Sequence, residues 1–161
     1  MRLIGILIAA PGRLKEPWWR EAAREYQKRL RPMAQIKIVE IKEEPLPSKP
    51  SAKDIGLALD KEAGSLARLI TGNETAVPLS AAGRPMTSEA LAEFIAEQNL
   101  NSREIVFLIG SSHGLSPQIL TMGAWNLSFG PMTFPRQMIR VMLLEQIYRA
   151  YTILNHMPYH K

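Results

Sequence analysis

Apolar and polar residues follow one another in blocks along the chain, and their spacing predicts alternating strands and helices. Continuous apolar runs bounded by turn residues predict buried strands over 2–9 and 104–110. Residues 35–41 are β-rich and predict another strand, although their alternation is imperfect. The shorter runs 75–79, which contains a proline, and 125–129 predict two weaker strands.

The helices are predicted by apolar spacing and by residues that begin helices. Residues 17–30 and 54–70 place apolar side chains one helical turn apart, with charges between them. Thr87 can cap a helix that continues to about residue 98, and Ser116 can cap a short helix that begins with a proline. The segment 136–154 predicts a long helix that is apolar on several faces.

This order of elements predicts the fold class. Strands alternating with helices indicate an α/β protein with a mostly parallel sheet and helices on both faces, and 161 residues fit a single domain over 1–161. Ligands of such folds bind beyond the carboxyl ends of the strands. The loops to inspect are therefore 10–16, 80–86, 110–116 and 130–135, and residues 80–85 are expected to be irregular.

Composition excludes several kinds of chemistry. The chain has no cysteine, which excludes disulfides, thiolate zinc sites and a cysteine nucleophile, and is typical of a reducing compartment. The opening apolar run is too short to cross a membrane, and no targeting segment is recognisable. Histidines and carboxylates do not cluster as metal ligands. We therefore expect a cytoplasmic protein with no membrane partner and no metal.

Basic residues are concentrated at the two ends of the chain. Residues 1–31 hold eight basic and three acidic residues, and 136–161 hold four and one, whereas 32–135 hold eight and eleven. This distribution indicates a polyanion such as nucleic-acid phosphate, although a solvated basic surface explains it equally well. The like charges one helical turn apart at the start of the last helix favour an anion between them. Candidate RNA contacts are Arg13, Lys15, Arg20, Arg24, Arg136 and Arg140.

Two loops carry candidate ligand-binding chemistry. "GSSHG" (110–114) can bring backbone amides close to a ligand, but it matches neither a Walker loop nor the dinucleotide fingerprint, and a plain turn fits equally well. His113 there is a candidate ligand or base, with a solvated histidine as the simpler interpretation. "FGPMTFP" (129–135) lacks charges, which suits an aromatic, hydrogen-bonding ligand such as adenine, or else a buried connector.

The last helix and the tail hold the remaining candidates. Glu145 and Arg149 have the favourable order for an ion pair one turn apart, which by default is structural. Two of the three histidines, His156 and His160, lie in the last six residues, and Tyr159 precedes the second. From the residues alone we infer an α/β ligand-binding domain with basic ends and a candidate functional tail. Spacing does not identify a reaction.

Longer motifs resemble a known family. "RLIGILIAAPGRLKEPWW", "LIGSSHGLS", "LSFGPMTFPRQMIRVMLLEQIYRAYTI" and the terminal "YHK" resemble the YbeA-like (RlmH) family of the SPOUT superfamily, from end to end. These are bacterial methyltransferases that act on a pseudouridine of 23S rRNA. The resemblance implies a C-terminal trefoil knot that forms the pocket for S-adenosylmethionine. The matching cofactor-binding positions are Leu79, Gly110, Phe129, Gly130, Pro131, Met132, Thr133 and Phe134.

The resemblance also implies a reaction. The family methylates N3 of pseudouridine 1915 in helix 69 of 23S rRNA, on the assembled 70S ribosome. It works as a homodimer in which the tail completes the site across the dimer. By this match His160 assists removal of the N3 proton, Tyr159 orients the base, and Arg149 stabilises negative charge on the base oxygens.

The sequence departs from the family pattern at three positions. Ser111 stands where a second glycine is common, Ser80 where an acid is common, and Arg136 where a histidine is frequent. A backbone-mediated pocket tolerates all three changes, but the last argues against a catalytic role for that position. Two alternatives stay open. One is a methyltransferase of the same superfamily that acts on another RNA such as tRNA. The other is a non-catalytic ribosome-binding module that keeps the donor pocket.

Overall fold

The computed structural model describes residues 3–161, so residue 2, where the predicted strand 2–9 begins, lies outside the described part. Strands and helices alternate along the described chain in the predicted order. The ten elements are β1 (Gly5–Pro11), α1 (Pro17–Leu30), β2 (Gln35–Ile41), α2 (Ala52–Ala67), β3 (Thr75–Pro85), α3 (Ser88–Leu100), β4 (Ile105–Leu108), α4 (Pro117–Leu120), β5 (Leu127–Ser128) and α5 (Arg136–Leu154).

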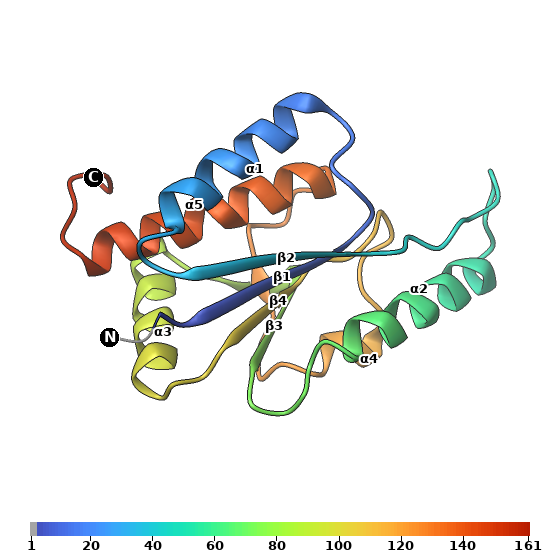
Figure 1. Ribbon diagram of the computed structural model, residues 1–161. Coiled ribbons are helices and arrows are strands. Elements are labelled where there is room, and N and C mark those ends of the chain that lie inside the picture. The colour runs from blue at the N-terminus through green and yellow to red at the C-terminus, as the bar shows by residue number, and fades with distance from the viewer. Residues whose placement is uncertain (1–2) are drawn as a thin grey trace.

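The strands form one sheet in the order β2-β1-β4-β3-β5, and every neighbouring pair is parallel. At its centre, Ile8 of β1 lies opposite Ile38 of β2 and Phe107 of β4. Helices α1, α3 and α5 cover one face, and α2 and α4 cover the other (Figure 1). The predicted parallel sheet with helices on both faces is confirmed. The trefoil knot stays a prediction.

The core lies in two layers, one on each face of the sheet. Strand β4 is buried along its whole length, and its side chains alternate between the layers. Phe107 packs with Leu143 of α5 in the larger layer, whereas Val106 packs with Leu66 of α2 in the smaller one. This double burial explains why β4 reads as a continuous apolar run in the sequence.

Side-chain caps fix where three helices begin. The Thr87 hydroxyl accepts a hydrogen bond from Ala90 N, and that of Ser116 accepts one from Ile119 N, as predicted. Helix α2 begins two residues before the predicted start because Ser51 and Asp54 form a reciprocal capping box. No helix within residues 3–161 is long and apolar enough to cross a membrane.

The prediction that residues 80–85 form an irregular loop was wrong. Strand β3 continues through them, and after a register shift Arg84 lies opposite Leu127 of β5, as Leu79 also does. Pro78 does not end the strand because it is the last β3 residue that pairs with β4, so its missing N–H falls at the end of that ladder. The extension places residues 79–82 at the carboxyl end of the sheet.

Candidate functional site

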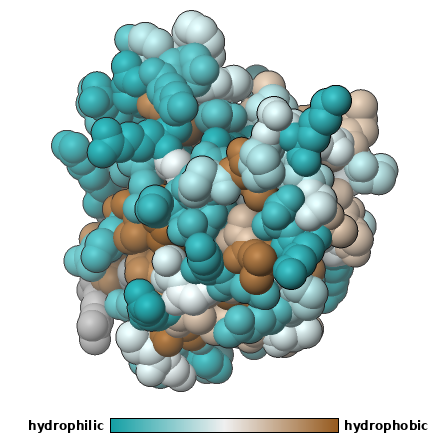
Figure 2. Space-filling view, turned by 90° about the vertical axis from the view of Figure 1, so that its right-hand side faces the viewer, coloured by the Kyte–Doolittle hydropathy of each residue, from teal (hydrophilic) through white to brown (hydrophobic). Residues whose placement is uncertain are grey.

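The last part of β3 and two loops converge at the carboxyl ends of the central strands, around a cavity of about 480 Å³ that we call the loop cavity. Its walls come from residues 79–82, residues 109–115 and the segment that joins β5 to the first turn of α5. Figure 2 shows this end of the molecule, where small apolar patches lie among hydrophilic side chains. Six predicted cofactor-binding residues line the loop cavity: Leu79, Gly110, Phe129, Gly130, Thr133 and Phe134.

The other two predicted cofactor-binding residues lie outside it. Pro131 and Met132 are exposed and are not part of the cavity wall, and Met132 is 72% accessible to solvent. The structure therefore places these two side chains on the outer side of a loop whose flanking residues face the cavity.

Glycines let the backbone itself form part of the cavity wall. A Cβ atom on Gly110 would lie 2.4 Å from the carbonyl carbon of Gly114, so no side chain fits there. The turn between them is closed by a hydrogen bond from Gly114 N to Ser111 O (2.9 Å). Gly130 has a φ of +114°, which other residues rarely adopt, and its N–H donates to the Ser128 hydroxyl (3.0 Å). Both loops are thus held with backbone groups near the cavity.

The loop cavity is mostly apolar or neutral. Its wall includes the guanidinium of Arg136, which is paired with both carboxylate oxygens of Glu43 (Nη2–Oε2 2.6 Å). This pairing lowers the pKa of Glu43. A neutral heterocycle with hydrogen-bonding edges suits such a wall better than a highly charged ligand.

The like charges of Arg136 and Arg140 are balanced by carboxylates of the same chain. Each guanidinium has its own carboxylate: Arg136 pairs with Glu43, and Nη1 of Arg140 lies 3.0 Å from Oε2 of Glu40. Arg140 also donates to the carbonyl of Gly12 (3.0 Å) and is 2% exposed. It joins α5 to the ends of β1 and β2 and is not accessible to an RNA phosphate.

The three predicted catalytic residues meet at the other end of α5. The Tyr159 hydroxyl donates to Glu145 Oε1 (3.1 Å), and Arg149 Nε donates to the same oxygen (3.0 Å). The Arg149 guanidinium lies 4.8 Å from the centre of the Tyr159 ring. Nδ1 of His160 lies 3.5 Å from Arg149 Nη1, and Nε2 lies 2.8 Å from Glu89 Oε1. We call these five residues the tail cluster.

Titration behaviour fits donor roles for two members of the tail cluster. Burial, with hydrogen bonds to Tyr26 and Glu145, raises the pKa of Tyr159 to about 12, so its hydroxyl keeps its proton at neutral pH. The hydrogen bond to Glu145 raises the pKa of Arg149, which therefore stays charged. Backbone hydrogen bonding and then the contact with His160 lower the pKa of Glu89.

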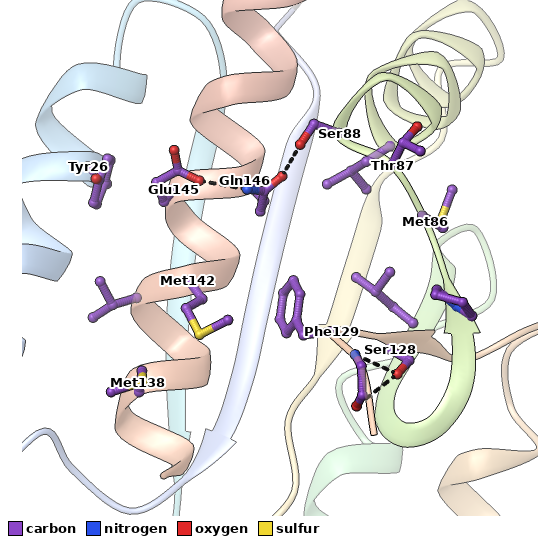
Figure 3. A pocket seen from close by; sticks show the side chains of 15 residues that line it. Tyr26, Met86, Thr87, Ser88, Ser128, Phe129, Met138, Met142, Glu145 and Gln146 are labelled. Carbon is purple, nitrogen blue, oxygen red and sulfur yellow. Dashed lines mark hydrogen bonds between the residues drawn. The ribbon is translucent and has the colours of Figure 1, made fainter. Parts of the chain in front are cut away.

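A second cavity of about 500 Å³, the helix cavity, lies between α5, α1 and the start of α3 (Figure 3). It shares Phe129 and Gly130 with the loop cavity. At its polar end Gln146 donates to Glu145 Oε2 (2.8 Å) and accepts from the Ser88 hydroxyl (2.7 Å). Because Glu145 also holds Tyr159, the helix cavity lies between the loop cavity and the tail cluster.

The tail cluster is distant from the loop cavity of its own chain. Ile139 is the last α5 residue in the wall of the loop cavity, and Arg149 is ten residues further along α5. At 1.5 Å per residue these positions are about 15 Å apart along the helix axis. Figure 1 shows α5 running from the carboxyl ends of the strands to their amino ends, where the tail lies.

The N-terminal basic residues differ in their surroundings. Arg20 donates to the carbonyls of Leu14 (3.0 Å) and Lys15, so its charge is directed at its own loop. Arg13, Lys15 and Arg24 are exposed, and no salt bridge within residues 3–161 involves them. These three remain available to an external anion.

Sequence reasoning missed the acidic partners of the site. Glu43, Glu40 and Glu89 lie 93, 100 and 71 residues from the side chains they bind. No local spacing links residues so far apart, and only the fold brings them together. His156 lies just after α5 with a φ of +53° and is exposed.

Comparisons with known proteins agree with this architecture. Residues 4–160 match the family described as "Predicted SPOUT methyltransferase". The crystal structure of TrmJ from Z. mobilis ZM4 is similar with a TM-score of 0.52 and 15% identity, over 93% of this chain and 70% of TrmJ, which shows the fold alone. The SpoU methyltransferase AviRb from Streptomyces viridochromogenes, solved in complex with AdoMet, gives a TM-score of 0.46 at 13% identity over 96% of this chain. The chain spans 59% of the length of AviRb.

Proposed function

This chain belongs to the family of predicted SPOUT methyltransferases, and from that premise we propose that it transfers a methyl group from S-adenosylmethionine to RNA. The proposed acceptor is N3 of pseudouridine 1915 in helix 69 of 23S rRNA, on the assembled ribosome in the cytoplasm. The observation that carries the proposal is the convergence of residues 79–82, 109–115, 129–130 and 133–134 on one cavity.

The loop cavity fits the donor in size and chemistry. Its volume of about 480 Å³ lies within the range of small-molecule sites, and Leu79, Phe129 and Phe134 offer apolar surface to an adenine ring. The turn of residues 110–114, where Gly110 has no room for a side chain, offers backbone groups to the edge of the base and the ribose. When bound, the donor supplies a methyl group on an electrophilic sulfonium, so strong activation by the protein is unnecessary.

Proton removal from the acceptor is assigned to the tail. As the N3–carbon bond forms and the carbon–sulfur bond breaks, the electron pair of that bond goes to sulfur and the N3 proton must leave. Nε2 of His160 contacts the Glu89 carboxylate and Nδ1 faces the Arg149 guanidinium, an arrangement in which Nε2 can donate and Nδ1 can accept. The Nδ1 lone pair accepts the N3 proton in this proposal once Arg149 turns from it toward the base oxygens.

The neighbours of His160 position and stabilise the base. Tyr159, protonated at neutral pH, presents a hydroxyl donor, and the permanently charged Arg149 stabilises negative charge that develops on the base oxygens. Both are held by Glu145, which fixes their orientation. Alignment of the sulfonium with N3 supplies most of the rate, since positioning can contribute roughly 7–11 kcal/mol.

The separation of about 15 Å along α5 supports a homodimer as the active species. If the tail cluster of one copy approaches the loop cavity of the other, donor and proton acceptor meet although they are distant within each chain. Arg13 and Lys15, which follow β1 at the carboxyl end of the sheet, are proposed to contact rRNA phosphates beside the loop cavity, with Arg24 further along α1.

Methyl transfer to defined RNA substrates tests the proposal. Ribosomes that lack the modification and total tRNA are incubated separately with the protein and radiolabelled donor, while calorimetry measures donor binding. We expect transfer to ribosomes only. Transfer to tRNA would move the activity to another substrate, and donor binding without any transfer would favour a ribosome-binding module that has no catalytic activity.

A further inference from the structure

The C-terminal half of α1 forms one wall of a hollow of about 490 Å³, of which only Arg24 was named above as an RNA contact. Three polar side chains of α1 and the side chain of Arg31, just after the helix, line it, and two small or apolar residues close it from the side of β2. Strand β2 is the edge strand of the sheet, so the hollow opens at the margin of the molecule. We call it the basic hollow, and its residues are Arg24, Gln27, Lys28, Arg31, Ala34 and Ile36.

The cations of the basic hollow have no acidic partners. Arg24, Lys28 and Arg31 follow one another at spacings of four and three residues, which places them on one side of α1. All three are exposed, and no salt bridge between residues 3 and 161 includes any of them. Like charges at this spacing repel one another. A bound anion would reduce this repulsion.

Arg29, a neighbouring arginine on α1, differs from the cations of the basic hollow because it has a carboxylate partner. Arg29 lies on the same turns of α1, but its Nε pairs with Glu25 (2.8 Å) and its guanidinium stacks near the rings of Tyr26 and Tyr148 at 5.6 and 5.7 Å. The negative end of the helix dipole favours Lys28 and Arg31 in the last turn. The dipole does not account for Arg24, nearly two turns earlier, or for the concave shape.

We infer that the basic hollow binds backbone phosphates of the RNA substrate. Arginine guanidinium groups match phosphate oxygens in pairs, lysine adds a point charge, and the Gln27 amide adds a neutral donor. The apolar floor of Ala34 and Ile36 carries no acid that would repel a phosphate. Binding at this site depends on the charge of the RNA backbone and not on the base sequence, as is general for phosphate contacts.

The position of the basic hollow relates it to the tail cluster. Tyr26, between Arg24 and Lys28 on α1, packs against Tyr148 with ring centres 6.1 Å apart, and Tyr148 packs against Tyr159 at 4.9 Å. Helix α1 is fourteen residues long, or about 21 Å, with Lys15 just before its start and Arg31 just after its end. A strand of RNA along α1 would contact both ends. This inference rests on the proposed RNA-directed function.

The test is the salt dependence of RNA binding by the full chain. Lys28→Glu/Arg31→Glu is compared with Lys49→Glu/Lys53→Glu, which makes the same change in net charge at exposed positions in and before α2. A Lys28→Gln/Arg31→Gln variant removes the charges without reversal. Probes are an RNA hairpin with the proposed target sequence and an unrelated single strand, each measured by fluorescence anisotropy at several salt concentrations.

We expect both basic-hollow variants to bind both RNAs at least tenfold more weakly at low salt. The slope of log affinity against log salt should fall by about 1.5, as for two lost phosphate contacts, and the α2 variant should match the parent. Equal loss in the α2 variant, or an unchanged slope in the basic-hollow variants, would overturn the inference. Calorimetry with S-adenosylmethionine on the same proteins tests the donor site separately, so failure of the proposed function is recognised independently.

Discussion

Nε2 of His160 lies 2.8 Å from Oε1 of Glu89, although 71 residues separate them in the sequence. The contact joins the end of the chain to the first turn of α3. Together with the bond from Tyr159 to Glu145, it holds two side chains that would otherwise belong to a frayed terminus. The chain end is thus an ordered part of the structure, and this order is what a role in proton transfer requires.

Replacement of Glu89 by glutamine should weaken the tail without touching the donor site. The charged partner of His160 is lost, so the imidazole is less well oriented, and we expect the rate of methyl transfer to fall roughly tenfold, below the 10²–10⁴-fold contribution of a complete acid–base group. Single-turnover kinetics measure the rate, and calorimetry should give unchanged donor affinity. Glu93→Gln, at an exposed position on the same helix, is the control. Equal rates for Glu89→Gln and the parent would remove Glu89 from the site.

Deletion of residues 159–161 should abolish methyl transfer and spare donor binding. The deletion removes Tyr159 and His160, whereas all six residues that line the loop cavity from the predicted cofactor set remain. Mixed dimers sharpen the test: a tail-deleted chain combined with a chain whose loop cavity is disabled should regain activity if the tail acts on the partner. A fully active deletion variant would exclude the tail from catalysis.

Gly110→Ala should reduce donor affinity at least tenfold. The new Cβ would lie 2.4 Å from the Gly114 carbonyl, so the turn of residues 110–114 must open and the cavity wall must move. Gly64→Ala is a matched control, because no atom lies within 4 Å of its Cβ and alanine is favoured in the middle of α2 by about 0.5–1 kcal/mol. Calorimetry with S-adenosylmethionine distinguishes them, and parental affinity in Gly110→Ala would show that this turn does not form the donor site.

Alkaline pH should destabilise the protein in part through Tyr159. The folded protein raises the pKa of this phenol from about 10 to about 12, so its contribution to stability is complete below pH 10 and is lost as pH rises toward 12. Urea unfolding between pH 9 and 12 should show a smaller decline for Tyr159→Phe than for the parent. Burial also raises the pKa of Tyr151 to about 12. Part of the loss of stability at alkaline pH should therefore remain in the Tyr159→Phe variant. An identical loss of stability in the parent and in Tyr159→Phe would contradict the raised pKa of Tyr159.

Arg140→Met should affect stability and leave RNA binding intact. The guanidinium is buried and bonded to Glu40 and to the carbonyl of Gly12, so its loss should lower the free energy of unfolding by about 1–3 kcal/mol. The figure is below that of a fully buried pair because the Glu40 side chain is 40% exposed and can be hydrated. Denaturant unfolding measures the loss. A reduced salt slope of RNA binding in a folded variant would restore Arg140 as an RNA contact.

Much of the fold follows from local patterns. The bounds of α1, β2 and α5 agree with the predicted ranges: α1 has regular apolar spacing and begins at Pro17, β2 is rich in β-forming residues, and α5 follows Pro135. The extension of β3 was missed because its pairing with Leu127 depends on a strand of only two residues, which no local pattern specifies.

The candidate site was predicted unevenly for a related reason. Parallel strands end at the same edge of the sheet, so the segments that follow their carboxyl ends meet there. The position of the loop cavity could therefore be predicted from the sequence. The ion pairs could not, because Arg136 and Arg140 look like a repelling pair until the fold brings Glu43 and Glu40 beside them. Similarly, Arg20 looks available to RNA until its bonds to Leu14 and Lys15 are seen.

Transfer of a labelled methyl group to ribosomes tests the central claim most directly. Ribosomes that lack the modification are incubated with the protein and S-adenosylmethionine labelled in the methyl group, and the rRNA is digested to nucleosides. We predict one labelled methyl group per large subunit, on N3 of a single pseudouridine in helix 69. Label found only in tRNA, or absent from every RNA although the donor binds, would contradict the claim.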